Sequence, residues 1–122
     1  MQLQKENNQT KVNVKSYQPG EIVLNVGRFH EVILLINGGK KDFSGAKTFA
    51  ELSFSDLAGE LAQKPEILII GTGDKHQILP MTITKKINEM GIAVEAMASR
   101  QACHTYQVLV YDQRVVYALI YP

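Results

Sequence analysis

Two short segments of this sequence carry groups that could bind an anion. They contribute the candidate ligand-binding residues Gly71, Thr72, Gly73, Ser99 and Arg100. The backbone N–H groups of a glycine-rich turn can approach a ligand closely, and the first turn of a helix presents free N–H groups to an anion. The Ser99 hydroxyl and the Arg100 guanidinium add one neutral and one charged donor. If the segments meet, they form a polar cleft in which Arg100 contributes most to affinity.

Each segment also has a purely structural interpretation. The Gly-Thr-Gly turn lacks the spacer and the Gly-Lys-Ser/Thr ending of a Walker loop, and the third glycine of the dinucleotide fingerprint would fall on His76. Gly71 and Gly73 then either allow a tight exit from a strand or line a pocket for an anion or carbonyl. Ser99 is either part of that pocket or a helix cap beside a solvated arginine.

The remaining reactive side chains do not combine into a catalytic site. Cys103 and His104 are neighbours on a predicted helix, where they point about 100° apart and cannot readily form a nucleophile–base pair. We expect the Cys103 thiol to be buried as a small apolar group. His76 and His104 lack a certain carboxylate partner for a metal. The sequence therefore predicts no catalytic residues, metal or cofactor, and favours a non-enzymatic role.

The overall charge excludes several partners. With 13 basic and 12 acidic residues the net charge is +1, so no strong field would attract nucleic acid or an anionic membrane. One cysteine permits no intrachain disulfide. Residues 1–14 lack the apolar core of a signal peptide, and no apolar segment approaches the roughly 20 residues that span a bilayer. We expect a cytoplasmic protein without membrane insertion or a nucleic-acid partner.

The elements that must position the candidate site follow from hydrophobic patterning. Apolar runs at residues 12–17, 21–26 and 32–36 are joined by short connections, which favours antiparallel strands, and residues 37–42 read as a loop. Helices and strands then alternate, with helices expected at 53–64, 80–90 and 99–110 and strands at 66–70, 92–96 and 114–121.

Local signals support these boundaries. Ser53 and Asp56 have the spacing of a capping box, Pro80 suits the first turn of a helix, and Gly91 is well placed to close it. The predicted fold is α/β, with a flexible segment at 1–11 and a single domain at 12–122. Its single mixed sheet has antiparallel N-terminal strands followed by parallel βα units, with helices packed on the sheet. Parallel pairing of the strands at 66–70 and 92–96 would bring the two candidate segments together.

The third predicted helix carries a recognisable pattern. It resembles Met-x-Thr-x-x-Ala-x-x-Thr-Tyr-Asn-x-Leu, with Ser99 in place of the first threonine and Gln107 in place of the asparagine. The matching residues are Met97, Ala102, Thr105, Tyr106 and Leu109. Together with Pro65, the Gly-Thr-Gly turn, Pro80 and Gly91, this pattern covers residues 16–120. It resembles a family of small α/β proteins that includes the mitochondrial respiratory complex I assembly factor 3 and archaeal and bacterial members of unassigned function.

The resemblance implies a mixed-sheet domain and, for the mitochondrial relative, a role through protein partners. The leading hypothesis is therefore a non-enzymatic protein-interaction or assembly-type factor with a protein partner. The alternative is a small-molecule or anion-binding protein, or a minor enzyme, that uses the cleft at the Gly-Thr-Gly turn.

Overall fold

The structure, a computed structural model, describes residues 11–122. Within this range eight strands form two sheets: β1 (Val14–Gln18), β2 (Glu21–Leu24), β3 (Gly27–Phe29), β4 (Ile33–Ile36), β5 (Gly39–Asp42), β6 (Ile67–Thr72), β7 (Ala93–Met97) and β8 (Val116–Tyr121). The helices are α2 (Phe54–Ala58), α3 (Met81–Glu89) and α4 (Ser99–Tyr111), with short 3-10 helices η1 (Phe49–Glu51) and η2 (Glu60–Gln63). Apart from Lys11, the predicted flexible segment at 1–11 lies outside the described residues.

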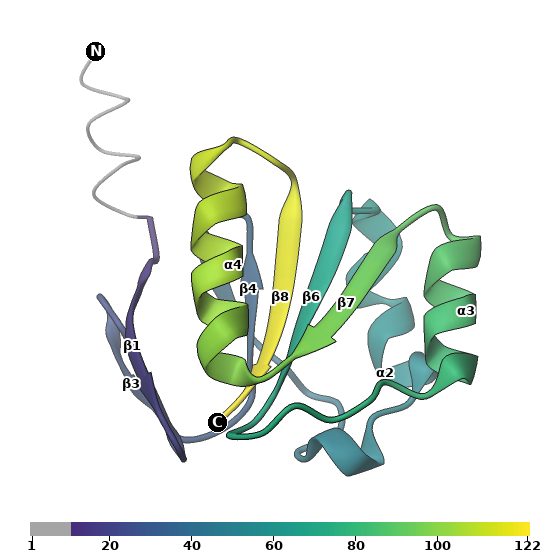
Figure 1. Ribbon diagram of the computed structural model, residues 1–122. Coiled ribbons are helices and arrows are strands. Elements are labelled where there is room, and N and C mark those ends of the chain that lie inside the picture. Colours follow the sequence, from purple (N-terminus) through teal and green to yellow (C-terminus); the bar gives the residue numbers. More distant parts are fainter. Residues whose placement is uncertain (1–10) are drawn as a thin grey trace.

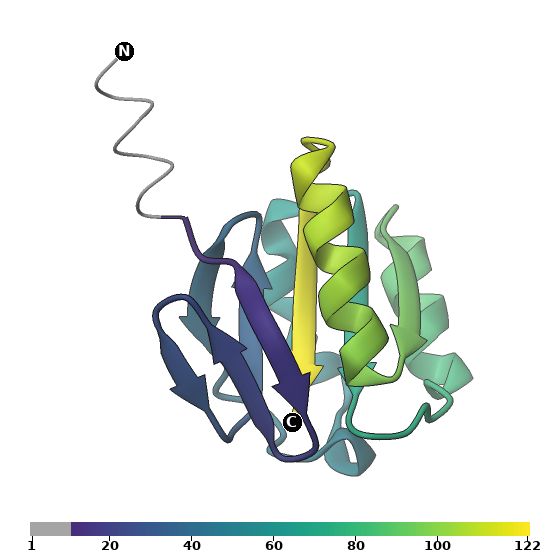
Figure 2. The same cartoon turned by 60° about the vertical axis from the view of Figure 1, so that its left-hand side comes forward.

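The predicted α/β class is confirmed, with antiparallel strands first and parallel units after them. A five-stranded sheet has the order β5-β4-β8-β6-β7, in which β6 runs parallel to both β7 and β8. The expected single sheet is, however, divided in two, because β1, β2 and β3 form an antiparallel sheet of their own (Figure 2). The side chains of Ile22 and Leu24 give β2 one apolar face, which packs against the larger sheet.

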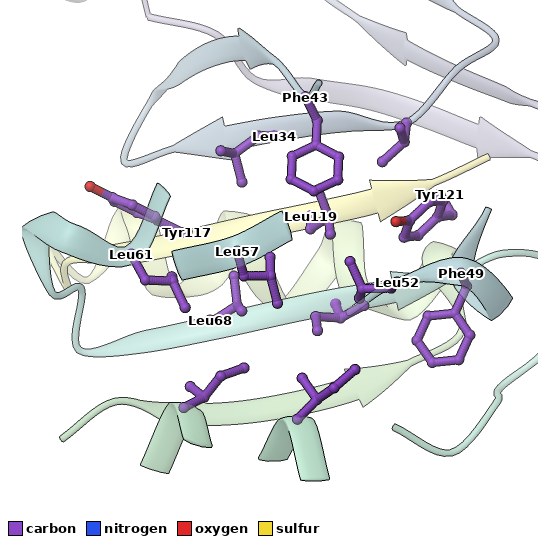
Figure 3. Close-up of a cluster of buried hydrophobic side chains, with 14 of the residues drawn as sticks. Leu34, Phe43, Phe49, Leu52, Leu57, Leu61, Leu68, Tyr117, Leu119 and Tyr121 are labelled. Carbon is purple, nitrogen blue, oxygen red and sulfur yellow. The ribbon is translucent and has the colours of Figure 1, made fainter. Parts of the chain in front are cut away.

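The central strands of the larger sheet, β4, β6 and β8, are buried on both faces, and the unbroken apolar run of β6 is typical of such a strand. In β6, Leu68 and Ile70 point into one core and Ile69 into the other. The first core lies under α2, α3 and the 3-10 helices, and Figure 3 shows its leucine and aromatic side chains. The second core lies between the sheet, α4 and the three-stranded sheet. Helix α4 therefore lies on the opposite face from α2 and α3 (Figure 1).

The predicted helix boundaries are largely confirmed. The Ser53 N–H donates to the Asp56 carboxylate at 3.0 Å, as in a capping box. Gly91 has the positive φ of +83° that closes α3. Pro80 is the residue just before α3 rather than within its first turn. The first expected helix is interrupted at Gly59, where the regular α2 gives way to the 3-10 helix η2.

Two short strands were not predicted. Strand β5 occupies the segment expected to be a loop, and β3 lies between two expected strands. Strand β5 is at the edge of the larger sheet, and its Lys40 and Lys41 lack the apolar pattern that identifies a strand. Charged side chains are common on edge strands because one side of such a strand faces water. Among residues 11–122, no helix has both the length and the apolar character needed to cross a membrane.

Candidate functional site

The two candidate segments meet, as the predicted parallel pairing requires. Strands β6 and β7 pair up to Gly71 and Met97, and α4 begins two residues after that pair. The Ser99 N–H donates to the Gly73 carbonyl at 2.8 Å. The Gly-Thr-Gly turn therefore lies against the first turn of α4.

The Ser99 hydroxyl is used inside the protein. It accepts a hydrogen bond from the Gly73 N–H at 2.9 Å and donates to the Tyr121 carbonyl at the end of β8. Ser99 is fully buried, and it is the first residue of α4 rather than the cap, a position held by Ala98. One hydroxyl thus joins β6, α4 and β8 at the carboxyl edge of the sheet. The Gly73 N–H and the Ser99 hydroxyl satisfy each other instead of facing a ligand.

The two glycines of the turn are needed for different reasons. Gly73 has a φ of +106°, a backbone conformation that residues other than glycine rarely adopt. Gly71 lies within β6, where α4 crosses so closely that a Cβ atom would be 2.7 Å from the Ser99 Oγ and 3.1 Å from the Ala102 Cβ. The first is a requirement of the turn and the second a requirement of helix–sheet packing.

Thr72 organises the loop that follows. Its hydroxyl donates to the Lys75 carbonyl at 2.7 Å and accepts from the Gln77 N–H at 3.1 Å, while the Gln77 side-chain amide donates to the Thr72 carbonyl at 2.9 Å. Each residue of the Gly-Thr-Gly turn therefore has a structural role. A hollow of about 470 Å³ opens beside this loop, with Lys47 and Lys75 among its lining residues.

Arg100 does not join the other four candidate residues. Its guanidinium carbon lies 5.5 Å from the centre of the Tyr17 ring, on the side of α4 that faces β1. Ser99 and Arg100 are consecutive helix residues, so their side chains point about 100° apart and reach different neighbours. Anion binding by Gly71, Thr72, Gly73 and Ser99 remains a prediction.

The Arg100 side chain instead lines a groove between β1 and α4, which lie side by side in Figure 2. The groove has a volume of about 370 Å³. We call it the β1–α4 groove. Its lining residues are Val14, Lys15, Ser16, Tyr17, Arg100, Cys103, His104 and Gln107. Sequence reasoning missed this site because it joins residues more than 80 positions apart through the packing of the small sheet on α4.

Gln107, the residue that replaces the asparagine of the family pattern, closes one end of the groove. Its side-chain oxygen accepts from the Val14 N–H at 3.0 Å, and its nitrogen donates to the Val14 carbonyl at 3.3 Å. The amide thereby pairs with the backbone of β1 as a neighbouring strand would. This contact fixes the distance between β1 and α4.

Burial dominates the electrostatics of the groove floor. It raises the pKa of the Cys103 thiol to about 11, against a weaker opposing effect of Arg100. It also raises the pKa of Tyr17, and the negative charge of Asp74 adds to that increase. Cys103 is buried, as the sequence predicts, and with this pKa its thiol is protonated at neutral pH. Within residues 11–122, no three His, Cys, Asp or Glu side chains are grouped so that they could hold a metal.

The chain is similar to a family of proteins of unknown function. The family described as "Protein of unknown function (DUF498/DUF598)" matches residues 14–121. A Francisella tularensis protein named "13 kDa major membrane protein" is 35% identical over 121 residues, which cover 98% of each chain. The human protein named "NADH dehydrogenase [ubiquinone] 1 alpha subcomplex assembly factor 3" is 32% identical over 93 residues. That match covers 76% of this chain and 47% of the human protein, so this chain spans about half the length of that relative.

Solved structures share the fold. A crystal structure of a Bordetella parapertussis protein superposes with a TM-score of 0.81 at 30% identity, covering 93% of this chain and 97% of the other. The solution structure of a Bordetella pertussis protein described as an Mth938-like domain gives a TM-score of 0.75 at 25% identity, covering 90% and 85%.

Proposed function

The chain belongs to the DUF498/DUF598 family of proteins of unknown function, and from this membership we propose that it is a non-enzymatic assembly-type factor that acts in the cytoplasm by binding a protein partner. The observation that carries the proposal is the similarity to the human assembly factor, which extends over 76% of this chain. The animal relatives with this name are 32–37% identical to it over the matched segments.

The chemistry of the Gly-Thr-Gly turn agrees with a non-enzymatic role. The backbone and side-chain groups of Thr72, Gly73 and Ser99 that could polarise a substrate are hydrogen-bonded to one another or to neighbouring loops. The Cys103 thiol is protonated at neutral pH and buried, which makes it a poor nucleophile. The pairing of these groups and the burial of this thiol support a binding role over a catalytic one.

The surface next to the turn suits contact with a protein. Ile78 and Met81, which are 83% and 75% exposed, lie three residues apart where the loop after β6 enters α3. Burying two large, exposed apolar side chains under a partner removes their surface from water, which makes a favourable contribution to the free energy of binding.

The anion-binding alternative has less support at the Gly-Thr-Gly cleft. The hollow beside the loop has two lysines in its lining, but the Gly73 N–H and the Ser99 hydroxyl face each other and Arg100 lies elsewhere. A metabolite thermal-shift screen tests this alternative, because a ligand at about 100 times its Kd should stabilise the protein by about 2.7 kcal/mol.

Affinity purification of the tagged full chain from its native cells tests the assembly role. We expect one protein to co-purify in a stoichiometric amount, and the same complex to form again from the two purified components in size-exclusion chromatography. An Ile78→Ser/Met81→Ser variant should lose that complex, whereas Val26→Ser, which changes an exposed apolar residue outside this surface, should retain it. Repeated purification without any stoichiometric partner would count against the proposal.

A further inference from the structure

The β1–α4 groove combines positive charge at its rim with an unsatisfied donor at its floor. Lys15, Arg100 and His104 are exposed and line the groove. Within residues 11–122, none of the three forms an ion pair with an acidic side chain. The basic groups around the groove are therefore available to a ligand rather than neutralised by the protein.

Tyr17 supplies the second, independent observation. Its side chain is 4% exposed and lines the groove. Among the described residues its hydroxyl is the one buried side-chain polar atom without a hydrogen-bond partner. Leaving such a group unpaired is costly, so buried polar atoms of this kind usually have a partner that the protein alone does not provide.

We propose that the β1–α4 groove binds a small organic anion. The anionic group lies at the rim between Arg100 and Lys15, with His104 beside them. The Tyr17 hydroxyl is buried and unpaired in this structure, so an oxygen of the ligand accepts its hydrogen bond once neighbouring side chains of the groove move aside. This inference does not depend on the assembly role proposed above.

The dimensions of the groove limit the class of ligand. Its volume of about 370 Å³ is at the lower end of the roughly 300–1,000 Å³ of small-molecule sites. The apolar contacts come from Val14, Tyr17 and Cys103, and the polar ones from Ser16 and Gln107. A compact carboxylate or phosphate compound fits this lining, whereas a dinucleotide would be too large.

The acidic side chain that influences the groove is Asp74, whose negative charge raises the pKa of the Tyr17 hydroxyl. Asp74 lines the hollow on the other side of the loop and is absent from the lining of the groove. Arg100, which carries a permanent charge and a planar set of donors, contributes the largest part of the binding.

Titration of the full chain, followed by amide chemical shifts in NMR, tests the proposal. The probes are sodium citrate for carboxylates and inorganic phosphate for phosphates, each against sodium chloride at matched ionic strength. We expect saturable shifts at Ser16, Arg100 and His104 with one or both probes, and the probe with the lower Kd identifies the preferred headgroup. If neither probe saturates by about 10 mM, a concentration that detects even Kd values in the millimolar range, the proposal is wrong.

Variants separate this site from general attraction of anions to a basic surface. Arg100→Gln should weaken binding by at least about tenfold, the usual effect of losing a charge-assisted hydrogen bond. Arg114→Gln, a matched change of an arginine that pairs with Glu66 outside the groove, should leave affinity unchanged. Equal losses in both variants would overturn the assignment. Lys15→Gln serves as a second test of the rim if Arg100→Gln fails to fold.

Tyr17→Phe tests the groove floor. We expect several-fold weaker binding in a protein that is at least as stable as the original chain, because the hydroxyl has no partner within the protein. Unchanged affinity in Tyr17→Phe would contradict the role of the hydroxyl.

Discussion

The two sides of the first turn of α4 differ in how completely their polar groups are paired. On the loop side, Ser99 is fully buried and bonded to both Gly73 and Tyr121. On the groove side, Arg100 is exposed and stacks on Tyr17, whose hydroxyl has no partner. The two residues are adjacent in the chain. The polar groups of the glycine-rich turn therefore hold the fold together, whereas those of the β1–α4 groove are free to bind a ligand.

The comparison predicts that the loop side tolerates change poorly. Gly71→Val should lower the free energy of unfolding by about 3 kcal/mol, because its side chain would overlap Ser99 and Ala102 in a packed core. Urea unfolding measures the effect. Gly59→Ala is the matched control: Gly59 has helical φ and ψ, and apart from its neighbours in the chain no atom lies within 4 Å of the place that an added methyl group would take, so stability should stay equal or rise by up to about 1 kcal/mol. Equal stability of Gly71→Val and the original chain would refute the close helix–sheet contact.

Ser99→Ala should have the next largest effect. It leaves the Gly73 N–H and the Tyr121 carbonyl without the hydroxyl that pairs with both, and the expected loss is about 2 kcal/mol. Ser55→Ala changes an exposed serine and should alter stability by less than about 0.5 kcal/mol. If both variants unfold at the same urea concentration, Ser99 does not hold the three elements together.

On the groove side, Cys103→Ala should cost only about 1 kcal/mol of packing, because the thiol acts as a small apolar group. Alkylation by iodoacetamide checks the protonation state: with a pKa of about 11, the thiolate is scarce at pH 8 and its fraction increases as the pH approaches that value. Rapid alkylation at pH 8 would contradict this description of the groove floor.

The smallest change in stability is expected for Tyr17→Phe, and its sign is informative. Removing an unpaired buried hydroxyl should leave the free energy of unfolding unchanged or raise it by up to about 1 kcal/mol. Tyr106→Phe is the matched comparison, because the Tyr106 hydroxyl accepts from the Gly38 N–H at 2.7 Å; it should lose about 1 kcal/mol. Thermal unfolding of both variants distinguishes the two tyrosines. A similar loss in each would mean that the Tyr17 hydroxyl is paired after all.

Much of the fold was predictable because its signals are local. The apolar run of β6, the Ser53–Asp56 capping box and Gly91 each mark an element within a few residues. Strand β5 was missed because Lys40 and Lys41 do not alternate with apolar residues at a sheet edge. The division into two sheets could not be predicted from spacing. The apolar residues of β2 indicate that one face of the strand is buried, but they do not specify which part of the protein packs against that face.

The candidate site was predictable only in part, for a geometric reason. Parallel pairing of β6 and β7 correctly placed Ser99 beside the Gly-Thr-Gly turn. The same helical geometry that separates Cys103 from His104 also separates Arg100 from Ser99, and applying it there would have directed Arg100 away from the turn. Arg100 instead contacts Tyr17, which is 83 positions away in the sequence. The hydrogen bond from the Val14 N–H to Gln107 helps to hold β1 in place for this contact.

The position of β8 has a consequence for how the protein is made. This strand is the central one of the larger sheet, with β4 on one side and β6 on the other, although it follows the other described strands of that sheet in the sequence. During synthesis, β4 and β6 lack their shared neighbour until residues 116–121 have left the ribosome, so the sheet must close late and through contacts distant in sequence. Such topologies fold slowly and leave unpaired strand edges open to other chains in the meantime. A nascent chain stalled before residue 116 would therefore be a natural client for chaperones.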